Sequence, residues 1–526
     1  LSGTSAAVDV ASYFGFTGII GNGTDSHLVG QDGVVNTWQI ESVLDSGSVA
    51  TDGLNDGTFT NTNDSILFID FVTLTGGNST DNFTISNTGS FNGTINGGSG
   101  TNTIQAKDAA LNTWAVTSSG IGSLNDATTT FNFTGMDNLL GGVNVDNFTL
   151  SDITHVTGLI DGGDGVDSVA ITANNQDVAL GTDISNIETL SAQAGTNTLR
   201  GTNTTNDWNI TTANIGTVND QTTTLSFTNF SELVGGTLVD DFLFASAGSV
   251  NSLAAGTGED IISVDNITQV ATTIDGGGND DILNLNTAGQ TITLDLVTSI
   301  ETINAAVGNN FLQGGSGTNT WTITSENAGM LNTTNFSNFN NLIGGADTDN
   351  FTLADMALVT GLIDGGAGTD KIDITGSTAQ DITLGTDIAR IETLNAQVGT
   401  NTLRGESATN DWRINTANTG TIDDQTTTLS FSNFSELVGG TLVDDFLFAS
   451  AGSVNSLAAG TGEDVISVDN ISQVATTIDG GGNDDILNLN TDGQIITLAS
   501  VTSIETINAT AGNNTLQGGS GTNTWT

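Results

Sequence analysis

The sequence predicts an all-β fold, a right-handed parallel β-helix (β-solenoid) with about 20 residues per rung. Three observations predict it: a glycine-rich turn that recurs, a longer repeat headed by tryptophan, and short segments in which apolar and polar residues alternate. Alternation with a period of two is typical of strands, as in Lys371-Ile372-Asp373-Ile374. No segment between the turns shows helical periodicity.

The recurring turn reads Ile-Asp-Gly-Gly and closes on a carboxylate. It spans residues 160–167 and 363–370, with looser copies at 274–281 and 478–485. Glycine adopts positive φ without steric cost, so each copy predicts a tight turn that leads into a strand. We expect these turns to stack and to form one corner of the solenoid.

Turn markers recur with a fine period of about 20 residues, which is one rung of a small parallel β-helix. One series of markers consists of Gly141, Gly162, Gly181 and Gly201. The spacing slips before Gly235, where Gly216 predicts a shorter or distorted rung.

Tryptophan marks a longer repeat. The six tryptophans lie at positions 38, 114, 208, 321, 412 and 525. Their spacings alternate, so the larger unit is a pair of blocks of about 204 residues. Each ring has a fixed place in its block, next to an apolar residue such as Ile210, and this favours a core or rung-end position over stacking on sugars.

These repeats divide the chain into four parts. They are an N-terminal cap or irregular first rungs (1–37), a degenerate repeat (38–113), a solenoid unit 114–320 with halves 114–207 and 208–320, and a solenoid unit 321–526 with halves 321–411 and 412–526. The chain begins with Leu1 and lacks a basic and then apolar leader, which predicts a processed or partial chain.

The composition excludes several function classes. Six Lys+Arg against 59 Asp+Glu give a net charge of −53, which argues against nucleic acid and anionic membranes as partners. There is no cysteine, so disulfides and zinc–thiolate sites are excluded. The cysteine-free, lysine-poor profile predicts export to the cell exterior or cell surface.

Calcium is the candidate cofactor. It takes six to eight oxygen ligands, more than one turn supplies, but stacked turns bring several carboxylates together. Like charges about 5 Å apart repel by roughly 1 kcal/mol in water, and a cation would relieve this repulsion. Solvated turn carboxylates without metal are the alternative. The candidate ligands are Asp161, Asp164, Asp167, Asp240, Asp241, Asp260, Asp280, Asp281, Asp364, Asp370, Asp444, Asp445, Asp464, Asp484 and Asp485.

A second set of acidic residues raises the question of catalysis. One glutamate recurs in each half-unit, and the set consists of Glu188, Glu301, Glu392 and Glu505. A glycosidase needs one specific pair of carboxylates, whereas a residue repeated along a solenoid is typical of an outward strand position. The few basic residues are scattered rather than clustered. We therefore expect no catalytic residue and no enzyme activity.

The glycine turns and the tryptophan-headed units resemble those of large exported bacterial repeat proteins. The segments 162–169 and 365–372 are similar to the Gly-Gly-x-Gly-x-Asp repeat of RTX proteins, and the whole of residues 38–526 resembles filamentous-haemagglutinin-like and RTX-like adhesins and surface fibres. The resemblance implies a parallel β-helix, an extracellular location and, from the RTX side, calcium between turns. Fold analogy alone identifies no ligand.

The sequence therefore predicts a structural extracellular protein that forms a rod, fibre, sheath or surface-layer element. Its partner would be itself, through end-to-end stacking and lateral association. Two alternatives stay open: the stalk of a large adhesin that meets cell-surface glycans, and a polysaccharide-binding or polysaccharide-active β-helix. Neither nucleic acid nor membrane insertion is expected.

Overall fold

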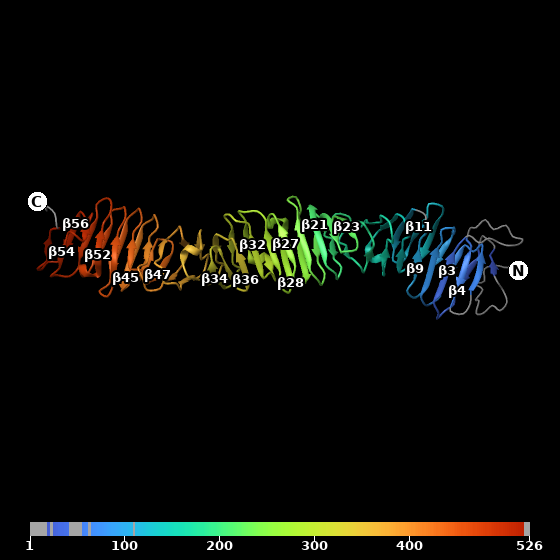
Figure 1. Cartoon of the computed structure of the whole chain (residues 1–526), viewed down its shortest axis with the longest axis horizontal. Helices are drawn as coiled ribbons and strands as arrows, with labels where there is room; N and C mark the ends of the chain where they lie inside the picture. Colours follow the sequence, from blue (N-terminus) through green and yellow to red (C-terminus); the bar gives the residue numbers. More distant parts are fainter. Residues whose placement is uncertain (1–17, 22–24, 42–54, 62–64, 109–110, 520–526) are drawn as a thin grey trace. The chain divides into compact units, whose positions relative to one another are not determined.

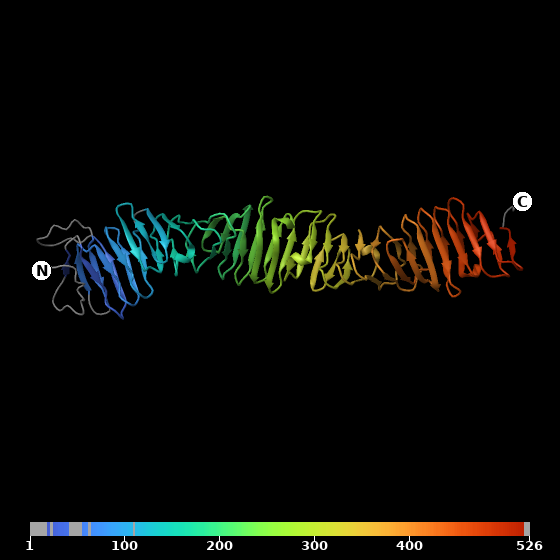
Figure 2. The same cartoon turned by 180° about the vertical axis from the view of Figure 1, so that it is seen from behind.

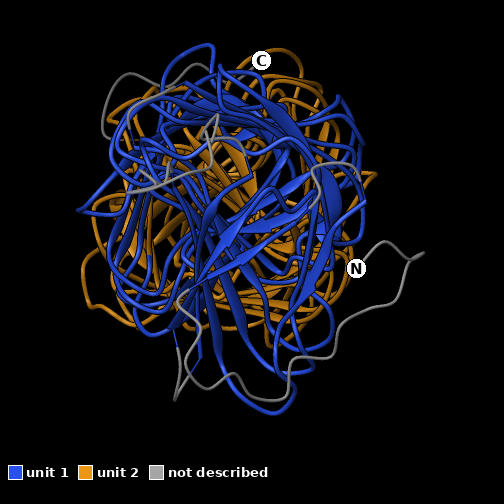
Figure 3. Cartoon of the chain, turned by 90° about the vertical axis from the view of Figure 1, so that its right-hand side faces the viewer, with its two compact units in different colours: residues 1–281 blue, residues 282–526 orange. Residues whose placement is uncertain are grey.

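The computed structural model describes residues 18–21, 25–41, 55–61, 65–108 and 111–519 (Figures 1 and 2). These residues form many short strands and five 3-10 helices. The chain divides into two compact units, residues 1–281 and 282–526, which Figure 3 distinguishes by colour. Each unit is described by itself.

In each unit the chain passes back and forth between two faces, and successive strands on one face pair in register and mostly in parallel. In unit 1, for example, Asn147 pairs with Ser168, which pairs with Thr189. In the rungs without a meander, hydrogen-bonded positions of neighbouring rungs lie 20 to 22 residues apart. This repeated, mostly parallel all-β architecture is that of a β-solenoid, as the sequence predicts.

We call the face that carries Trp114 the first sheet. In unit 1 its strands are β2 (His27–Val29), β6 (Thr73–Thr75), β8 (Thr94–Asn96), β10 (Asn112–Ser118), β11 (Ile121–Asn125), β12 (Thr130–Thr134), β14 (Asp146–Leu150), β16 (Ser168–Ile171), β19 (Thr189–Ser191), β21 (Asn206–Thr212), β22 (Ile215–Asn219), β23 (Thr224–Thr228), β25 (Asp240–Phe244) and β27 (Ile261–Val264).

The opposite face of unit 1 is the second sheet, built in two sections. The first section comprises β1 (Gly18–Ile20), β3 (Asn36–Ile40), β4 (Gly57–Thr60), β5 (Ser65–Ile69), β7 (Asp81–Ile85), β9 (Thr103–Gln105), β13 (Asn138–Leu140), β15 (Ile160–Asp161) and β18 (Ile184–Ser185). The second comprises β17 (Asp177–Ala179), β20 (Thr198–Arg200), β24 (Glu232–Val234), β26 (Val250–Thr257) and β28 (Val270–Gly278).

Unit 2 repeats both faces. Its first sheet contains β29 (Ile282–Leu285), β32 (Thr302–Ala305), β34 (Asn319–Ser325), β35 (Ala328–Leu331), β36 (Thr334–Ser337), β38 (Asp349–Leu353), β40 (Lys371–Ile374), β43 (Thr393–Asn395), β45 (Asn410–Thr416), β46 (Thr419–Asp423), β47 (Thr428–Ser432), β49 (Asp444–Phe448), β51 (Val465–Val468), β53 (Ile486–Leu489) and β56 (Thr506–Ala509).

Besides the short strand β31 (Val297–Thr298), the second sheet of unit 2 has three sections. They are β30 (Thr291–Thr293), β33 (Phe311–Gln313), β37 (Asn341–Ile343), β39 (Ile363–Asp364) and β42 (Ile388–Ala389); β41 (Asp381–Thr383), β44 (Thr402–Arg404), β48 (Glu436–Val438), β50 (Val454–Ala458), β52 (Val474–Asp479) and β55 (Val501–Thr502); and β54 (Ile495–Thr497) with β57 (Thr515–Gln517). The 3-10 helices are η1 (Ile153–His155), η2 (Ile267–Gln269), η3 (Leu294–Leu296), η4 (Met356–Leu358) and η5 (Ile471–Gln473).

Each described tryptophan strand begins a three-stranded antiparallel meander. In the second block β21 pairs antiparallel with β22, which pairs antiparallel with β23, while β21 also pairs in parallel with β25 of the next rung. Gly216 lies in the middle strand β22, where a Cβ would lie 2.4 Å from the carbonyl oxygen of Asn209. Gly216 therefore marks a distorted rung, as the sequence predicts, but this rung is longer rather than shorter, because two extra strands cause the slip in spacing.

The tryptophans are core residues, as the sequence predicts. All five described rings are at most 1% exposed. Trp208 stacks on Phe242 of the next rung with centroids 5.3 Å apart and an interplanar angle of 13°, and it meets Phe227 of its own meander edge-on. The same stack joins Trp412 to Phe446 in unit 2. Offset stacking of this kind adds about 0.5–1.5 kcal/mol to the burial of the rings.

The glycine turns stack at one corner, which confirms that part of the prediction. Gly163 and Gly165 have φ of 89° and 144°, which other residues adopt only with strain. The N–H of Asp164 donates to the carbonyl oxygen of Gly142 one turn earlier, at 3.1 Å. Gly162 is tightly enclosed, since a Cβ there would lie 2.1 Å from the carbonyl oxygen of Asn186.

Two predicted features lie partly outside the described residues. Most of the predicted N-terminal cap, residues 1–37, is not described, and neither is Trp525. In the part of the chain that is described, no helix has the length and apolar character needed to cross a membrane.

Candidate functional site

The closing carboxylates of the glycine turns form a buried ladder at the corner before parallel strands of the first sheet such as β14 and β16. In unit 1 the N–H of Asp146 donates to Oδ1 of Asp167 at 2.7 Å, and the N–H of Asp167 donates to Oε2 of Glu188 at 2.6 Å. Each side chain thus accepts a backbone hydrogen bond from the rung before it. Asp146 and Asp167 are fully buried.

The next block of unit 1 repeats the ladder. The N–H of Asn206 donates to Oδ1 of Asp240 at 3.0 Å, that of Asp240 to Asp260 at 2.7 Å, and that of Asp260 to Asp281 at 2.8 Å. Asp240, Asp260 and Asp281 have no exposed surface. The carboxylates are therefore part of the backbone hydrogen-bonding pattern rather than of the solvated turn surface.

Unit 2 builds the same device twice. In its first half the N–H of Asp349 donates to Asp370 at 2.8 Å, and that of Asp370 donates to Glu392 at 2.6 Å. In its second half the N–H of Asp444 donates to Asp464 at 2.8 Å and that of Asp464 donates to Asp485 at 2.9 Å. The N–H of Asp485 then donates to Glu505 at 2.9 Å.

Strand alternation explains why these aspartates point inward. Asp240 begins β25, whose burial alternates so that Asp240, Phe242 and Phe244 face the core while Asp241 and Leu243 face solvent. The preceding turn completes the site, because the N–H of Gly236 also donates to Oδ2 of Asp240. Asp240 thus occupies a core-facing position, where an apolar residue is usual, and backbone N–H groups satisfy its carboxylate.

Stacking carboxylates in the core raises their pKa values. Burial, followed by the charges of Asp281 and Asp240, raises the pKa of Asp260 to about 7 although it accepts the Asp240 N–H. Burial and the charges of Asp444 and Asp485 likewise raise the pKa of Asp464 to about 7.

Three other ladder aspartates show the same effect. Burial and neighbouring carboxylates raise the pKa of Asp167 and of Asp370 to about 6. Burial raises the pKa of Asp444 to about 6. These groups exchange protons close to neutral pH, whereas an exposed aspartate is ionised there.

The structure separates the fifteen candidate calcium ligands into three groups. The ladder contains Asp167, Asp240, Asp260, Asp281, Asp370, Asp444, Asp464 and Asp485. The half-buried first turn positions Asp161 and Asp364 accept from the N–H of the second following residue. The remaining five are exposed: Asp164, Asp241, Asp280, Asp445 and Asp484.

The geometry gives the ladder and the exposed turn positions different chemistry. The ladder side chains accept backbone hydrogen bonds, and the Oδ2 atoms of Asp260 and Asp464 are buried with no hydrogen-bond partner. Within the described residues, no group of three or more His, Asp or Glu side chains is arranged to hold a metal ion. The exposed turn carboxylates are the ones open to solvent cations, and calcium binding by them stays a prediction.

Three of the four recurring glutamates belong to the same ladder. Glu188, Glu392 and Glu505 each accept the N–H of the last aspartate through Oε2, so they form the end of their ladders. The sequence favoured plain outward strand positions for them. Their regular spacing was the available signal, but it does not reveal that the longer glutamate side chain reaches back one rung.

A second polar ladder, which the sequence reasoning missed, lies at the opposite corner. The N–H of Gln176 donates to Oδ1 of Asn197 at 2.8 Å, and that of Gln380 donates to Asn401 at 2.9 Å. Both glutamines are largely buried. The signal was a recurring Gln before the strand and Asn 21 residues later, but these amides carry no charge that would draw attention to them.

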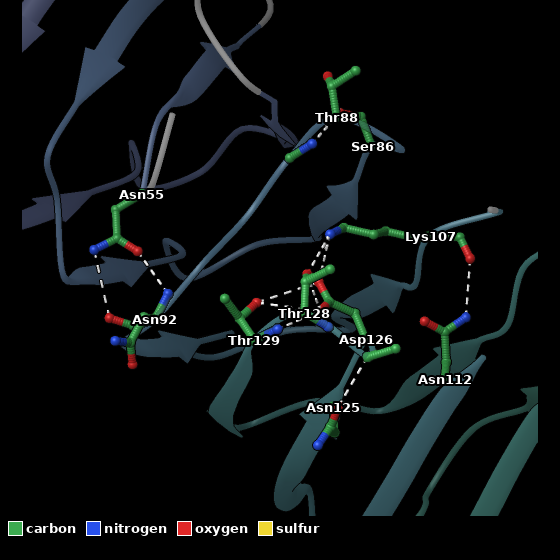
Figure 4. Close-up of polar contacts among 12 residues, drawn as sticks. Asn55, Ser86, Thr88, Asn92, Lys107, Asn112, Asn125, Asp126, Thr128 and Thr129 are labelled. Atoms are coloured by element: carbon green, nitrogen blue, oxygen red, sulfur yellow. Dashed lines mark hydrogen bonds and ion pairs between the residues drawn. The ribbon is translucent and has the colours of Figure 1, made fainter. Parts of the chain in front are cut away.

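A buried ion pair lies beside the tryptophan strand β10. Lys107 Nζ lies 2.8 Å from Oδ2 of Asp126, and the two side chains are 6% and 0% exposed (Figure 4). Lys107 also donates to Thr128 Oγ1, and the N–H groups of Thr128 and Thr129 donate to Asp126. Burial alone would raise the pKa of Asp126, but these hydrogen bonds together lower it. The pair joins the β11–β12 turn to the segment before β10.

The corresponding place beside the tryptophan strand β45 carries two like charges, those of Glu406 and Asp424. The carbonyl oxygens of Lys107 and Glu406 accept equivalent hydrogen bonds from Nδ2 of Asn112 and Asn410. Burial and the nearby charge of Asp424 raise the pKa of Glu406. The repeats thus share a frame while their side-chain pairs differ.

The two histidines form no catalytic arrangement with the described residues around them. His27 is exposed and contacts Thr75 Oγ1, and the half-buried His155 contacts Ser151 Oγ through Nδ1 at 2.8 Å.

Neither a scan against protein-family models nor a search of curated proteins found a match to this chain.

Proposed function

We propose that this chain is a structural extracellular repeat protein that forms a rod, fibre, sheath or surface-layer element by self-association. The observation that carries the proposal is that both units repeat the same set of core contacts. This set consists of the carboxylate ladder and the Trp–Phe stack. A repeat protein stabilised by nearest-neighbour contacts can be extended without limit, which suits a mechanical role.

The acidic residues that would have served catalysis support this proposal. Glu188 and Glu392 each accept a backbone hydrogen bond inside the solenoid corner. A carboxylate occupied in this way is a structural group in each repeat. We therefore propose a non-enzymatic protein, with a right-handed solenoid of about 20 residues per rung.

Electron microscopy of the purified full chain tests the proposal. We expect filaments, bundles or sheets whose abundance grows with protein concentration. Dispersed monomers at every concentration would contradict the structural role and would favour the alternative of an adhesin stalk, which extends a binding tip but does not assemble.

Calcium enters the proposal only through the exposed turn carboxylates such as Asp241 and Asp445. A ligand that binds only the folded state raises its stability by RT ln(1 + [L]/Kd). We expect the thermal unfolding midpoint to rise with added calcium and to fall again with chelator. An unchanged midpoint would remove calcium from the account.

A further inference from the structure

A section of the first sheet of unit 1 has no charged side chain at its outward strand positions, and it ends where Asp207 of β21 follows β22. Across the neighbouring strands β6, β8, β12, β11, β10, β14, β16, β19, β23 and β22, all of them fully described, the outward positions hold only threonine, serine, asparagine, alanine or isoleucine. We name the outward residues of these strands the neutral face. Figure 1 labels two of these strands, β11 and β23.

The outward side chains lie in register from strand to strand. One continuous row consists of Thr113, Asn147, Ser168, Thr189, Ser226 and Thr217. Neighbours in the row hydrogen-bond to each other where their lengths allow, as Ser168 Oγ does to Asn147 Oδ1 at 2.6 Å. The face therefore presents a regular array of hydroxyl, amide and methyl groups.

The rest of the molecule makes this absence of charge informative. The chain has a net charge of −53. On the second sheet of the same unit, outward positions include Asp177, Glu232 and Asp275. In unit 2 the strand β40 carries Lys371 and Asp373 at its outward positions. The strand chemistry thus tolerates charge, and the neutral face lacks it.

We infer that the neutral face binds the neutral face of a second copy of this chain, and that it is the lateral contact of the assembly. This inference rests on the proposed function. Two polyanions can approach closely only where like charges do not meet, and this face is such a place. Hydroxyl and amide groups both donate and accept, so identical faces can hydrogen-bond to each other about a two-fold axis.

The size and chemistry of the face agree with this partner. About ten strands at 4.8 Å spacing and about 13 Å of strand length give an area of roughly 600 Å² per partner. Stable interfaces bury about 800 Å² per partner, so one pair of faces would bind weakly and an array of copies more firmly. The face has neither an aromatic ring for stacking on sugars nor a cation for acidic glycans in these ten strands.

Charge substitutions on the full chain test the inference. Thr189→Asp and Thr189→Lys each place a charge on the neutral face, and Thr273→Asp makes the same change at an exposed position of β28 on the second sheet. Sedimentation velocity across a wide concentration range measures association. We expect both Thr189 variants to weaken dimer formation about tenfold or more, because either charge must be desolvated, and Thr273→Asp to leave it unchanged.

The outcomes separate the inference from the proposed function. If the wild-type chain assembles and the Thr189 variants assemble equally well, the neutral face is not the contact, while the structural role stands. If only Thr189→Asp weakens assembly and Thr189→Lys strengthens it, net charge rather than this face controls association, which overturns the inference. In a third outcome, the wild-type chain stays monomeric and is retained on a cross-linked dextran matrix on which the Thr189 variants are not retained. The face then binds neutral glycan, and both proposals fail.

Discussion

The backbone N–H of Asp240 donates a 2.7 Å hydrogen bond to Oδ1 of Asp260, which lies 20 residues further along the chain. A side chain of one rung thereby completes the backbone hydrogen bonding of the rung before it. The relation recurs between Asp444 and Asp464 in unit 2. It places ionisable groups in register along the core, so the fold is linked to proton binding.

This linkage predicts that the fold is more stable in mild acid than at alkaline pH. The pKa of Asp260 and that of Asp464 are about 7 in the folded chain, raised by burial and by neighbouring carboxylates. Unfolded aspartate titrates near 3.9, so between about pH 4 and pH 7 the folded chain binds more protons than the unfolded one. The free energy of unfolding must then fall as pH rises through this window.

Urea unfolding at a series of pH values measures this dependence. We expect the midpoint to increase from about pH 8 to about pH 5, with each raised carboxylate contributing up to about 1.4 kcal/mol per pKa unit. Salt should weaken the dependence less than it would for exposed charges, because the ladder is buried. A midpoint that increases with pH over the same range would contradict the protonated ladder.

Asparagine and alanine at position 260 separate the two roles of this carboxylate. Asp260→Asn keeps an oxygen acceptor for the Asp240 N–H and removes the charge, as Asn102 does naturally when it accepts the N–H of Asp81 at 3.1 Å. We expect this variant to gain stability at pH 8 and to lose part of the pH dependence.

Asp260→Ala leaves the Asp240 N–H without an acceptor, which costs about 1–3 kcal/mol. The matched pair of substitutions at Asp464 repeats the test in unit 2, where the geometry is the same. Equal midpoints for the asparagine and alanine variants would show that the hydrogen bond to the preceding rung contributes nothing.

The glycine turns and their closing aspartates show how far local sequence carries the prediction. Positive φ at Gly163 and inward alternation at Val169 follow from steric and period-two rules, and both are present. The solenoid class follows from their recurrence. Calcium ligation seemed equally natural for Asp167, but the choice between a metal and a backbone N–H depends on the neighbouring rung.

The meanders and the amide ladder lie beyond such local rules. The strand around Gly216 has the same alternation as a parallel strand, so its antiparallel direction is set only by pairing with β21 and β23. Gln176 meets Asn197 across one rung, and nothing in either segment alone specifies that contact. Register between distant segments is a tertiary property, which the sequence pattern does not contain.

Close packing at the corner predicts that Gly162 cannot be replaced. A Cβ at this position would lie 2.1 Å from the carbonyl oxygen of Asn186 and 2.6 Å from Oδ2 of Asp167. We expect Gly162→Ala to lower the free energy of unfolding by about 1–3 kcal/mol through overpacking. Gly317→Ala is the control, since no atom lies within 4 Å of its Cβ and its φ is not positive. Chemical denaturation of both variants gives the comparison, and similar midpoints would contradict the tight corner.

The ion pair between Lys107 and Asp126 supplies a prediction about the variation between repeats. Removing the ammonium leaves a fully buried carboxylate without its cation, which typically costs about 3–5 kcal/mol. We expect Lys107→Met to lower the free energy of unfolding of unit 1 by about this amount. The double variant with Asp126→Asn should recover much of the loss, because no buried charge then remains unpaired.

Introducing a lysine at the corresponding position beside β45 should stabilise unit 2. Glu406 lies near Asp424, whose charge adds to burial in raising the Glu406 pKa. Glu406→Lys would replace this repulsion with an attraction of the kind seen at Lys107, and because the site is partly exposed we expect a gain of about 0.5–1 kcal/mol. Asp424→Asn in the Glu406→Lys background should cancel the gain. Thermal unfolding of the wild-type chain and these two variants decides the matter, and a gain that survives loss of Asp424 would show that charge pairing is not its cause.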